Sequence, residues 1–264
     1  MSASLNQIVT WTRQRVAKVK GAGNLTELEK LAEAHKPRGF RRGLEDVGHI
    51  RPSVIAELKK ASPSKGLIRA DFRPAQLAQE LAAAGAAALS VLTDEEFFQG
   101  SLENLRVASS VTKLPCLRKD FMVDGFQVLE ARAFQADAIL LIVAALTQGD
   151  LVRLAQRAME YELDVLCEVH DEDELSRALD AGCTLIGVNS RDLKTFHVDL
   201  QTAFRLAEKM PKSVLSVAES GIHSAADIAR LRDAGYGAFL IGESLMKATS
   251  PGDALRSLLG VSGK

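Results

Sequence analysis

The sequence predicts an α/β fold in which eight strands and eight helices alternate and close into a (β/α)₈ barrel, with a helical extension at the N-terminus. Short apolar runs of strand length recur, helical patterns fill the gaps between them, and most runs end at an ionisable or loop-forming residue. Such alternation indicates a parallel sheet. The 264 residues suit one TIM barrel, which typically takes about 250 residues. A doubly wound sheet is the alternative, but its Gly-rich turn after the first strand is missing.

The first 50 residues precede the first expected strand. We therefore divide the chain into a helical extension, residues 1–50, and a barrel, residues 51–264, that forms a single domain. Two amphipathic patches, residues 5–19 and 25–34, are separated by Gly21-Ala22-Gly23. We expect them to cap the barrel as helices, and a regulatory or dimerising arm is the alternative.

A weak internal repeat marks the helix ends and strand starts. Ala84-Gly85, Ala181-Gly182 and Ala234-Gly235 each precede an apolar run, and Ala136-Asp137 takes the same place before a fourth. A glycine there closes a helix in the left-handed conformation, and the run that follows has the composition of a strand covered on both faces. Helical patterns span residues 74–84, 101–110, 125–135, 148–161, 172–180, 200–209, 225–233 and 253–259. Strands are expected to begin near Val54, Ala87, Pro115, Ala138, Asp164, Thr184, Val214 and Ala238.

Composition and charge argue against several classes of protein. A net charge of -1 gives no basic excess for a nucleic-acid partner. The longest apolar stretch, residues 136–146, is far shorter than the roughly 20 residues that span a bilayer, and no secretory signal is evident. We therefore expect a cytoplasmic protein without membrane contact. Cys116, Cys167 and Cys183 lack paired spacing, so we expect three buried free thiols and no metal site.

Ionisable residues and glycines follow the expected strands. In such a barrel all strands end on one side, so these residues converge over a single mouth. They are Glu57 and Lys59, Lys119, Glu168, Asn189 and Arg191, Glu219-Ser220-Gly221, and Gly242-Glu243.

Two lysine–carboxylate pairs are the candidate acid–base groups. Strand alternation places Glu57 and Lys59 on one face, where the alternative is an ion pair that only closes the mouth. Lys119 and Glu168 end two other strands. An ammonium beside a carboxylate in a partly dry pocket forms a general acid and base pair. The alternative is Lys119 as a Schiff-base nucleophile, and the sequence pattern does not separate the two.

Two glycine-containing loops indicate a phosphate site. Ser220-Gly221 and Gly242-Glu243 follow the seventh and eighth strands, where barrels of this kind bind phosphate through backbone amides. The alternative is that the glycines only allow tight turns. Residues 62–66 form a polar loop with a basic tip, and loops on this face close over substrates. The expected substrate class is a phosphorylated small molecule.

Nine segments spread over nearly the whole chain carry a family resemblance. They are PRGF at 37–40, VIAELKKASPSKG at 54–66, LSVLTD at 89–94, FFQGS at 97–101, LRKDF at 117–121, CEVH at 167–170, IGVNSRDL at 186–193, AESG at 218–221 and GESLM at 242–246. In these segments the chain closely resembles the indole-3-glycerol phosphate synthase family. Departures are mild: cysteines replace aliphatic residues at 116 and 167, and Gln135 and Ala136 replace a common Ala-Gly pair.

The resemblance implies a carboxy-lyase of L-tryptophan biosynthesis. Its reaction cyclises 1-(2-carboxyphenylamino)-1-deoxyribulose 5-phosphate to indole-3-glycerol phosphate, with loss of CO₂ and water. No cofactor is expected, because the aniline nitrogen supplies the electrons. The resemblance implies that Lys119 is the acid for ring closure, Glu168 the base for dehydration and Lys59 a second acid, with Glu57 orienting the lysines. Sequence leaves open which lysine acts in which step.

The resemblance also implies the substrate contacts. Asn189 and Arg191 would face the anthranilate side and its carboxylate, for which a guanidinium fork is well shaped. The resemblance places Asn189 among the catalytic residues. The other implied contacts are Phe98 and Pro63 to the aromatic ring, Ser62 and Glu219 to the substrate, and Ser220, Gly221, Gly242 and the Glu243 backbone amide to the phosphate. We expect a monomer. The alternatives are another phosphosugar barrel lyase or isomerase, or a non-catalytic barrel that binds a phosphometabolite.

Overall fold

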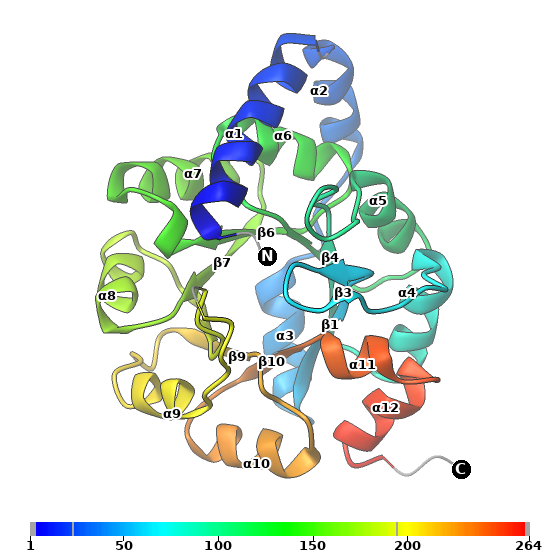
Figure 1. Ribbon diagram of the computed structural model, residues 1–264, viewed down its shortest axis with the longest axis vertical. Coiled ribbons are helices and arrows are strands. Elements are labelled where there is room, and N and C mark those ends of the chain that lie inside the picture. Colours follow the sequence, from blue (N-terminus) through cyan, green and yellow to red (C-terminus); the bar gives the residue numbers. More distant parts are fainter. Residues whose placement is uncertain (1–3, 23, 194, 262–264) are drawn as a thin grey trace.

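The computed structural model describes residues 4–22, 24–193 and 195–261, and it confirms the predicted barrel (Figure 1). Eight parallel strands close in the order β1-β4-β5-β6-β7-β8-β9-β10, and β1 pairs with both β4 and β10. All eight strands begin within one residue of the predicted position. Their bounds are β1 Ser53–Leu58, β4 Ala88–Leu92, β5 Cys116–Lys119, β6 Ala138–Ile142, β7 Asp164–Val169, β8 Leu185–Asn189, β9 Leu215–Glu219 and β10 Ala238–Ile241.

Helices cover the outside of the barrel between successive strands. Thr147, Asp171 and Ser224 cap three of them by accepting hydrogen bonds from backbone amides that have no helical partner. Within the described ranges, no helix is both long and apolar enough to cross a membrane. The outer helices are α4 Pro74–Ala83, α5 Leu102–Ser110, α6 Gly125–Ala133, α7 Gln148–Glu160, α8 Glu172–Asp180, α9 Gln201–Ala207, α10 Ala225–Asp233 and α12 Pro251–Leu258.

Four short elements add to this pattern. The polar loop at residues 62–66 belongs to a small hairpin, in which β2 Ala61–Ser62 pairs antiparallel with β3 Gly66–Leu67. A 3₁₀ turn, Val143–Ala145, follows β6. Helix α11, Glu243–Lys247, follows β10 directly, so the predicted phosphate loop is the start of a short helix.

The repeat is confirmed at three of its four positions. Gly85, Gly182 and Gly235 have φ values of 100°, 77° and 107°, and each precedes its strand by three residues. The fourth position was wrong by two residues, because the left-handed residue before β6 is Gln135, at φ 67°, and not a member of the Ala136-Asp137 pair. The sequence hides this position because a non-glycine residue occupies it.

Asp137 serves instead to anchor the N-terminal segment to the barrel. Its fully buried carboxylate accepts hydrogen bonds from the backbone amides of Cys116 and Arg38 and from the Arg38 guanidinium. Burial raises the pKa of Asp137, but His35 and Arg38 outweigh it and hold that pKa below its usual range. The carboxylate is therefore an ion that depends on Arg38.

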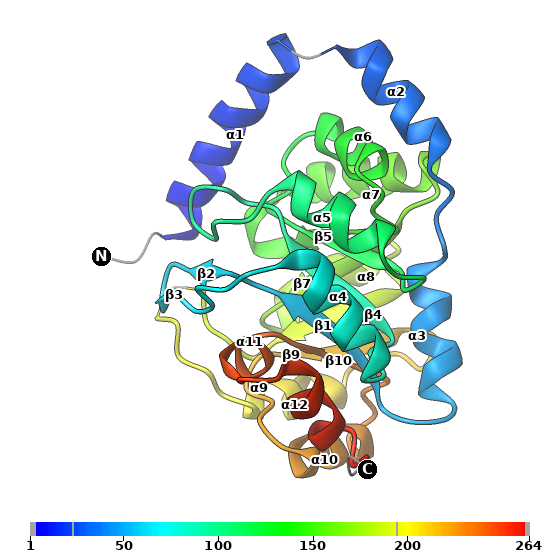
Figure 2. The ribbon, with the colours of Figure 1, turned by 90° about the vertical axis from the view of Figure 1, so that its right-hand side faces the viewer.

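Three helices precede β1 and run from one end of the barrel to the other. Helix α3, Phe40–Gly48, was not predicted, and it lies at the end opposite the β2–β3 hairpin (Figure 2). Its Phe40 and Leu44 pack into the barrel interior. Helix α2, Leu25–Ala34, packs on α6, and α1, Leu5–Ala22, reaches the mouth. Gly23 of the predicted break lies outside the described residues.

The prediction of three free thiols was wrong for two of them. Cys167 on β7 and Cys183 just before β8 form a disulfide, with Cα atoms 6.5 Å apart. Both side chains lie in the apolar layer between strands and helices, and β7 and β8 are neighbouring strands of the barrel. A separation of 16 residues is no recognised spacing, so only the tertiary structure reveals the pair. Cys116 is free and buried, and burial raises the pKa of its thiol to about 12.

Candidate active site

A cavity of about 440 Å³ opens at the carboxyl ends of the strands. Every strand of the barrel contributes at least one lining residue, as expected where parallel strands end on one side. The structure brings together every predicted site residue at this cavity: Glu57, Lys59, Ser62, Pro63, Phe98, Lys119, Glu168, Asn189, Arg191, Glu219, Ser220, Gly221, Gly242 and Glu243.

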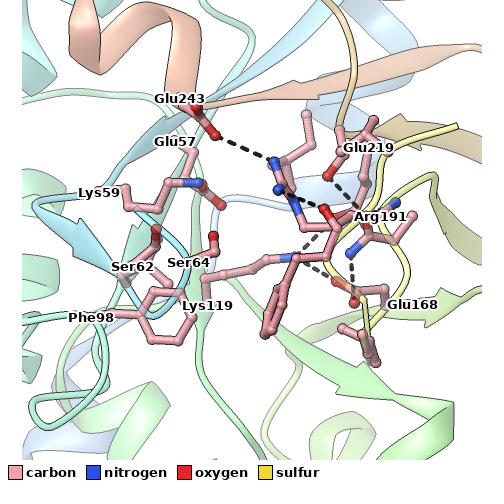
Figure 3. A pocket seen from close by; sticks show the side chains of 18 of the residues that line it. Glu57, Lys59, Ser62, Ser64, Phe98, Lys119, Glu168, Arg191, Glu219 and Glu243 are labelled. Atoms are coloured by element: carbon pink, nitrogen blue, oxygen red, sulfur yellow. Dashed lines mark hydrogen bonds and ion pairs between the residues drawn. The ribbon is translucent and has the colours of Figure 1, made fainter. Parts of the chain in front are cut away.

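Lys119 ends β5, and its ammonium lies between two carboxylates (Figure 3). Nζ donates hydrogen bonds to Glu168 Oε2 at 2.7 Å and to Glu219 Oε2 at 2.8 Å. Burial opposes the charge, but Glu168, Glu219 and Glu57 outweigh it and raise the pKa of Lys119 above its ordinary value. Lys119 is therefore protonated, whereas a Schiff-base lysine must be a neutral amine. The arrangement favours an acid over the alternative nucleophile.

Glu168 is held by three side chains from different parts of the barrel. Besides the Lys119 ammonium on Oε2, Oε1 accepts a hydrogen bond from Asn189 Nδ2 at 3.1 Å and lies 3.4 Å from His170 Nε2. Burial raises the pKa of Glu168, but Lys119 and His170 outweigh it and hold that pKa well below its usual range. Glu168 is thus an ionised, fixed carboxylate at the cavity wall.

Glu219 is the second carboxylate on Lys119, and its environment differs. Burial raises its pKa, Glu168 adds to the rise, and the Lys119 ammonium opposes it, so the pKa of Glu219 lies at about 7. Oε1 is buried and has no hydrogen-bond partner among the described residues. It lies over Gly187 of β8, where an added Cβ would be only 2.0 Å away. The missing side chain at Gly187 makes room for Glu219.

Glu57 and Lys59 form an ion pair on the β1 side of the cavity. Lys59 Nζ lies 2.7 Å from Glu57 Oε1, and the Glu57 side chain is almost completely buried. Gly242 leaves space for this carboxylate, because a Cβ there would be 2.4 Å from Glu57 Oε1. Both residues line the cavity. The two side chains therefore form the ion pair of the structural alternative, and they also lie where they could act on a substrate.

Arg191 and Glu243 face each other across the loops after β8 and β10. Arg191 Nη2 lies 3.3 Å from Glu243 Oε2, and Lys247 lies 2.6 Å from the other oxygen of Glu243. Burial raises the pKa of Glu243, but Lys247 and Arg191 outweigh it and lower that pKa. The guanidinium is therefore already paired with a carboxylate.

Ser220 and Gly221 form a tight turn after β9. Both are left-handed, with φ values of 65° and 78°. A Cβ on Gly221 would lie 2.8 Å from Val198 Cγ1, so glycine is required for space as well as for conformation. The Ser220 hydroxyl donates to Asn189 Oδ1 at 2.9 Å, which ties this turn to the Glu168 side of the cavity.

An apolar wall completes the cavity, and sequence reasoning found only part of it. Phe98 lies beside Phe121, with ring centroids 6.2 Å apart. Leu5 and Ile8 of α1 also line the cavity, although their apolar spacing indicates only an amphipathic helix. Their position depends on how α1 packs on the barrel, which the sequence does not show.

The fold and the site define a barrel of the enzyme class, with a cavity in which acidic and basic side chains meet at the strand ends. The chain belongs to the indole-3-glycerol phosphate synthase family, whose model matches residues 5–258. It is 61% identical over 260 residues to the indole-3-glycerol phosphate synthase of Koribacter versatilis, covering 98% of this chain and 100% of the relative. It is 51% identical over 259 residues to that of Acinetobacter baumannii (strain AYE), covering 97% and 95%.

Solved structures resemble the chain in fold alone. A 3-hexulose-6-phosphate synthase aligns with a TM-score of 0.64 at 14% identity, covering 80% of this chain and 100% of that one. A thiamine phosphate pyrophosphorylase from Pyrococcus furiosus aligns with a TM-score of 0.61 at 15% identity, covering 79% and 94%. These likenesses support the barrel architecture.

Proposed function

We propose that this chain converts 1-(2-carboxyphenylamino)-1-deoxyribulose 5-phosphate to indole-3-glycerol phosphate, CO₂ and water in L-tryptophan biosynthesis. The observation that carries the proposal is the Lys119 ammonium between two carboxylates at the mouth of a barrel of this family. The reaction needs a proton donor at one step and a base at a later one. These three side chains supply both within hydrogen-bond distance.

Ring closure is the step for Lys119. The ring carbon that bears the carboxylate attacks the ribulose carbonyl, and negative charge develops on the carbonyl oxygen. Lys119 donates a proton there, and its raised pKa ensures that it carries that proton at neutral pH. The carboxylate then leaves as CO₂, which restores the aromatic ring without a redox step.

The position of Lys119 links ring closure to dehydration. While Lys119 is an ammonium, it depresses the basicity of Glu168, with which it shares a 2.7 Å hydrogen bond. Once Lys119 has given up its proton, that opposing charge is gone and the pKa of Glu168 rises. The acid step therefore prepares the base for the next step.

Dehydration then uses Glu168 and Lys59. Glu168 removes a proton from the carbon next to the nitrogen, while Lys59 protonates the departing hydroxyl, which leaves as water. The proton on Glu168 returns to Lys119 through their hydrogen bond. Lys119 and Lys59 each give one proton to the substrate, and Glu168 removes one. Lys59 is therefore reprotonated from solvent once per turnover.

The remaining contacts are assigned from their positions around the cavity. Asn189 orients Glu168, and Arg191 binds the anthranilate carboxylate with its planar fork. We further propose a monomeric, cytoplasmic protein with one phosphorylated substrate and neither nucleic-acid nor membrane partners. The other proposed substrate contacts are Phe98 and Pro63 to the ring, Ser62 and Glu219 to the sugar, and Ser220, Gly221, Gly242 and the backbone of Glu243 to the phosphate.

Indole fluorescence tests the proposal directly. The wild type should form the indole product, whereas Lys119→Met and Glu168→Gln should each lose about 10²–10⁴-fold in kcat, the range typical of a lost acid or base. The matched controls are Lys113→Met and Glu208→Gln, which change exposed residues of the same types. Both should retain wild-type kcat. A folded wild type that forms no indole would refute the activity, and full activity of Lys119→Met would refute the role of that lysine.

A further inference from the structure

His170 lies directly after β7 and behind Glu168, outside the cavity lining. Its ring is positioned between two carboxylates. Nδ1 is 2.9 Å from Glu174 Oε2, and Nε2 is 3.4 Å from Glu168 Oε1. The side chain is only 13% exposed, so little solvent screens these contacts. His170 thus connects the proposed base with a carboxylate on the first turn of α8.

Glu174 fixes both the orientation and the charge of this ring. Its carboxylate accepts hydrogen bonds from the backbone amide of His170 and from Nδ1, both at 2.9 Å. Its own backbone amide donates to Asp171, the N-cap of α8. The contact with Glu174 keeps a proton on Nδ1 and leaves Nε2 facing Glu168. Burial opposes a charged ring, but Glu168 and Glu174 outweigh it and raise the pKa of His170 to about 10.

His170 breaks a symmetry at the centre of the site. Lys119 lies at nearly equal distances, 2.7 and 2.8 Å, from Glu168 and Glu219, so this contact alone favours neither carboxylate. One ammonium cannot keep two buried carboxylates ionised, because two carboxylates that share the same ammonium repel each other when both are charged. Glu57 on β1 adds a further negative charge that acts on Lys119 and on Glu219. The imidazole lies beside Glu168, whereas Lys119 is the one cation within ion-pair distance of Glu219 among the described residues.

We propose that His170 is a positioning residue that determines which of the two carboxylates stays ionised. Its imidazolium, held by Glu174, keeps Glu168 as the anion and leaves the proton to Glu219. This inference rests on the proposed function, because it assigns Glu168 the part of base. Glu219 then remains a neutral hydrogen-bonding group. Glu168 is already ionised before ring closure, and its basicity rises once Lys119 gives up its proton.

The pH dependence of kcat tests this role. His170→Asn removes the cation, so protons should redistribute toward Glu168 and the acid limb of the kcat profile should move up by about one to three pH units. KM should change less than about twofold, because His170 does not line the cavity. Glu174→Gln, which keeps an acceptor for Nδ1 but removes its charge, should move the limb in the same direction by less. The control His49→Asn, at an exposed position, should leave the profile unchanged.

A purely structural role predicts a different result. It would lower kcat equally at every pH and leave the limb in place, and this outcome overturns the proposal. If His170→Asn does not fold, Glu174→Gln decides the matter with the ring still present, and an unmoved limb in that variant also overturns it. Thermal unfolding of each variant identifies which case applies.

Imidazole ¹⁵N NMR gives a readout that does not depend on activity. His170, assigned by its loss in His170→Asn, should keep both ring nitrogens protonated to about pH 9, and Glu168→Gln should lower its pKa. A ring that titrates near its ordinary pKa of about 6.5 overturns the proposal. If the wild type forms no indole, the proposed function fails, while these spectra still decide whether His170 is charged and coupled to Glu168.

Discussion

Gly187 offers the sharpest test of how closely the two carboxylates on Lys119 must be placed. It lies on β8 beneath Glu219, outside the left-handed region, so its backbone accepts alanine. The added Cβ would be 2.0 Å from Glu219 Oε1 and 3.1 Å from its Cδ. Ordinary contact begins at about 3.4 Å, so the carboxylate must retreat by more than 1 Å. Its other oxygen is fixed by Lys119 at 2.8 Å, and the two demands conflict.

The expected effect of Gly187→Ala follows from that displacement. Misplacing a catalytic group by about 1 Å costs about 10²-fold in rate, so kcat should fall about 100-fold in the indole fluorescence assay. Overpacking should also cost about 1–3 kcal/mol of stability, measured by urea unfolding. Gly149→Ala is the matched control, because nothing lies within 4 Å of its Cβ position.

A double-mutant cycle assigns the loss to Glu219. If Gly187→Ala acts by displacing this side chain, the double variant Gly187→Ala/Glu219→Ala should be no slower than Glu219→Ala alone. Losses that multiply would show that the methyl group acts elsewhere, for example on Leu166, whose Cδ1 would lie 3.3 Å away. Wild-type kcat in a folded Gly187→Ala protein would refute the reasoning altogether.

Three further predictions concern stability and affinity. Arg38→Ala leaves the buried Asp137 carboxylate without its cation, and it should lower the free energy of unfolding in urea by about 3 kcal/mol at pH 7 with kcat unchanged. This loss should shrink as pH falls below about 4, because a carboxylate with a depressed pKa stabilises the fold only above that range. Glu219 has a pKa of about 7 in the folded protein, so the stability of the wild type should fall as pH rises from about 4.5 through 7. Urea unfolding at pH 5 and at pH 8 should therefore show the free energy of unfolding of Glu219→Gln rising relative to wild type by up to about 3 kcal/mol between the two pH values. Arg191→Lys keeps the charge but loses the fork, and steady-state kinetics should show KM rising about tenfold with kcat little changed.

The placement of the site residues could be predicted because it depends on topology. Once the strands are recognised as parallel and closed, the residues that follow them must meet at one mouth, and Glu57, Lys119 and Glu219 do so although they come from distant parts of the chain. Strand starts were predictable from a local signal, because left-handed glycines such as Gly85 mark the helix ends that precede the strands.

Other features depend on side-chain packing that no local pattern encodes. Leu5 and Ile8 reach the cavity only because α1 begins at the mouth, on the same side as the β2–β3 hairpin (Figure 2). The pairing of Cys167 with Cys183 depends on two neighbouring strands. The different pKa values of Glu168 and Glu219 require the distances to Lys119 and His170, whereas in the sequence both are simply glutamates at strand ends.

The ion pairs at the mouth also bear on how the product leaves. Arg191 is held by Glu243 at 3.3 Å, so a substrate carboxylate that binds Arg191 must displace a carboxylate of the protein. Because one ion pair is exchanged for another, the net affinity that Arg191 adds is limited to about the tenfold expected to be lost in Arg191→Lys, but the exchange discriminates against molecules that lack a carboxylate. The proposed reaction removes that carboxylate as CO₂, after which the product has no group to compete with Glu243. Arg191 therefore favours substrate over product without the tight binding that would slow release.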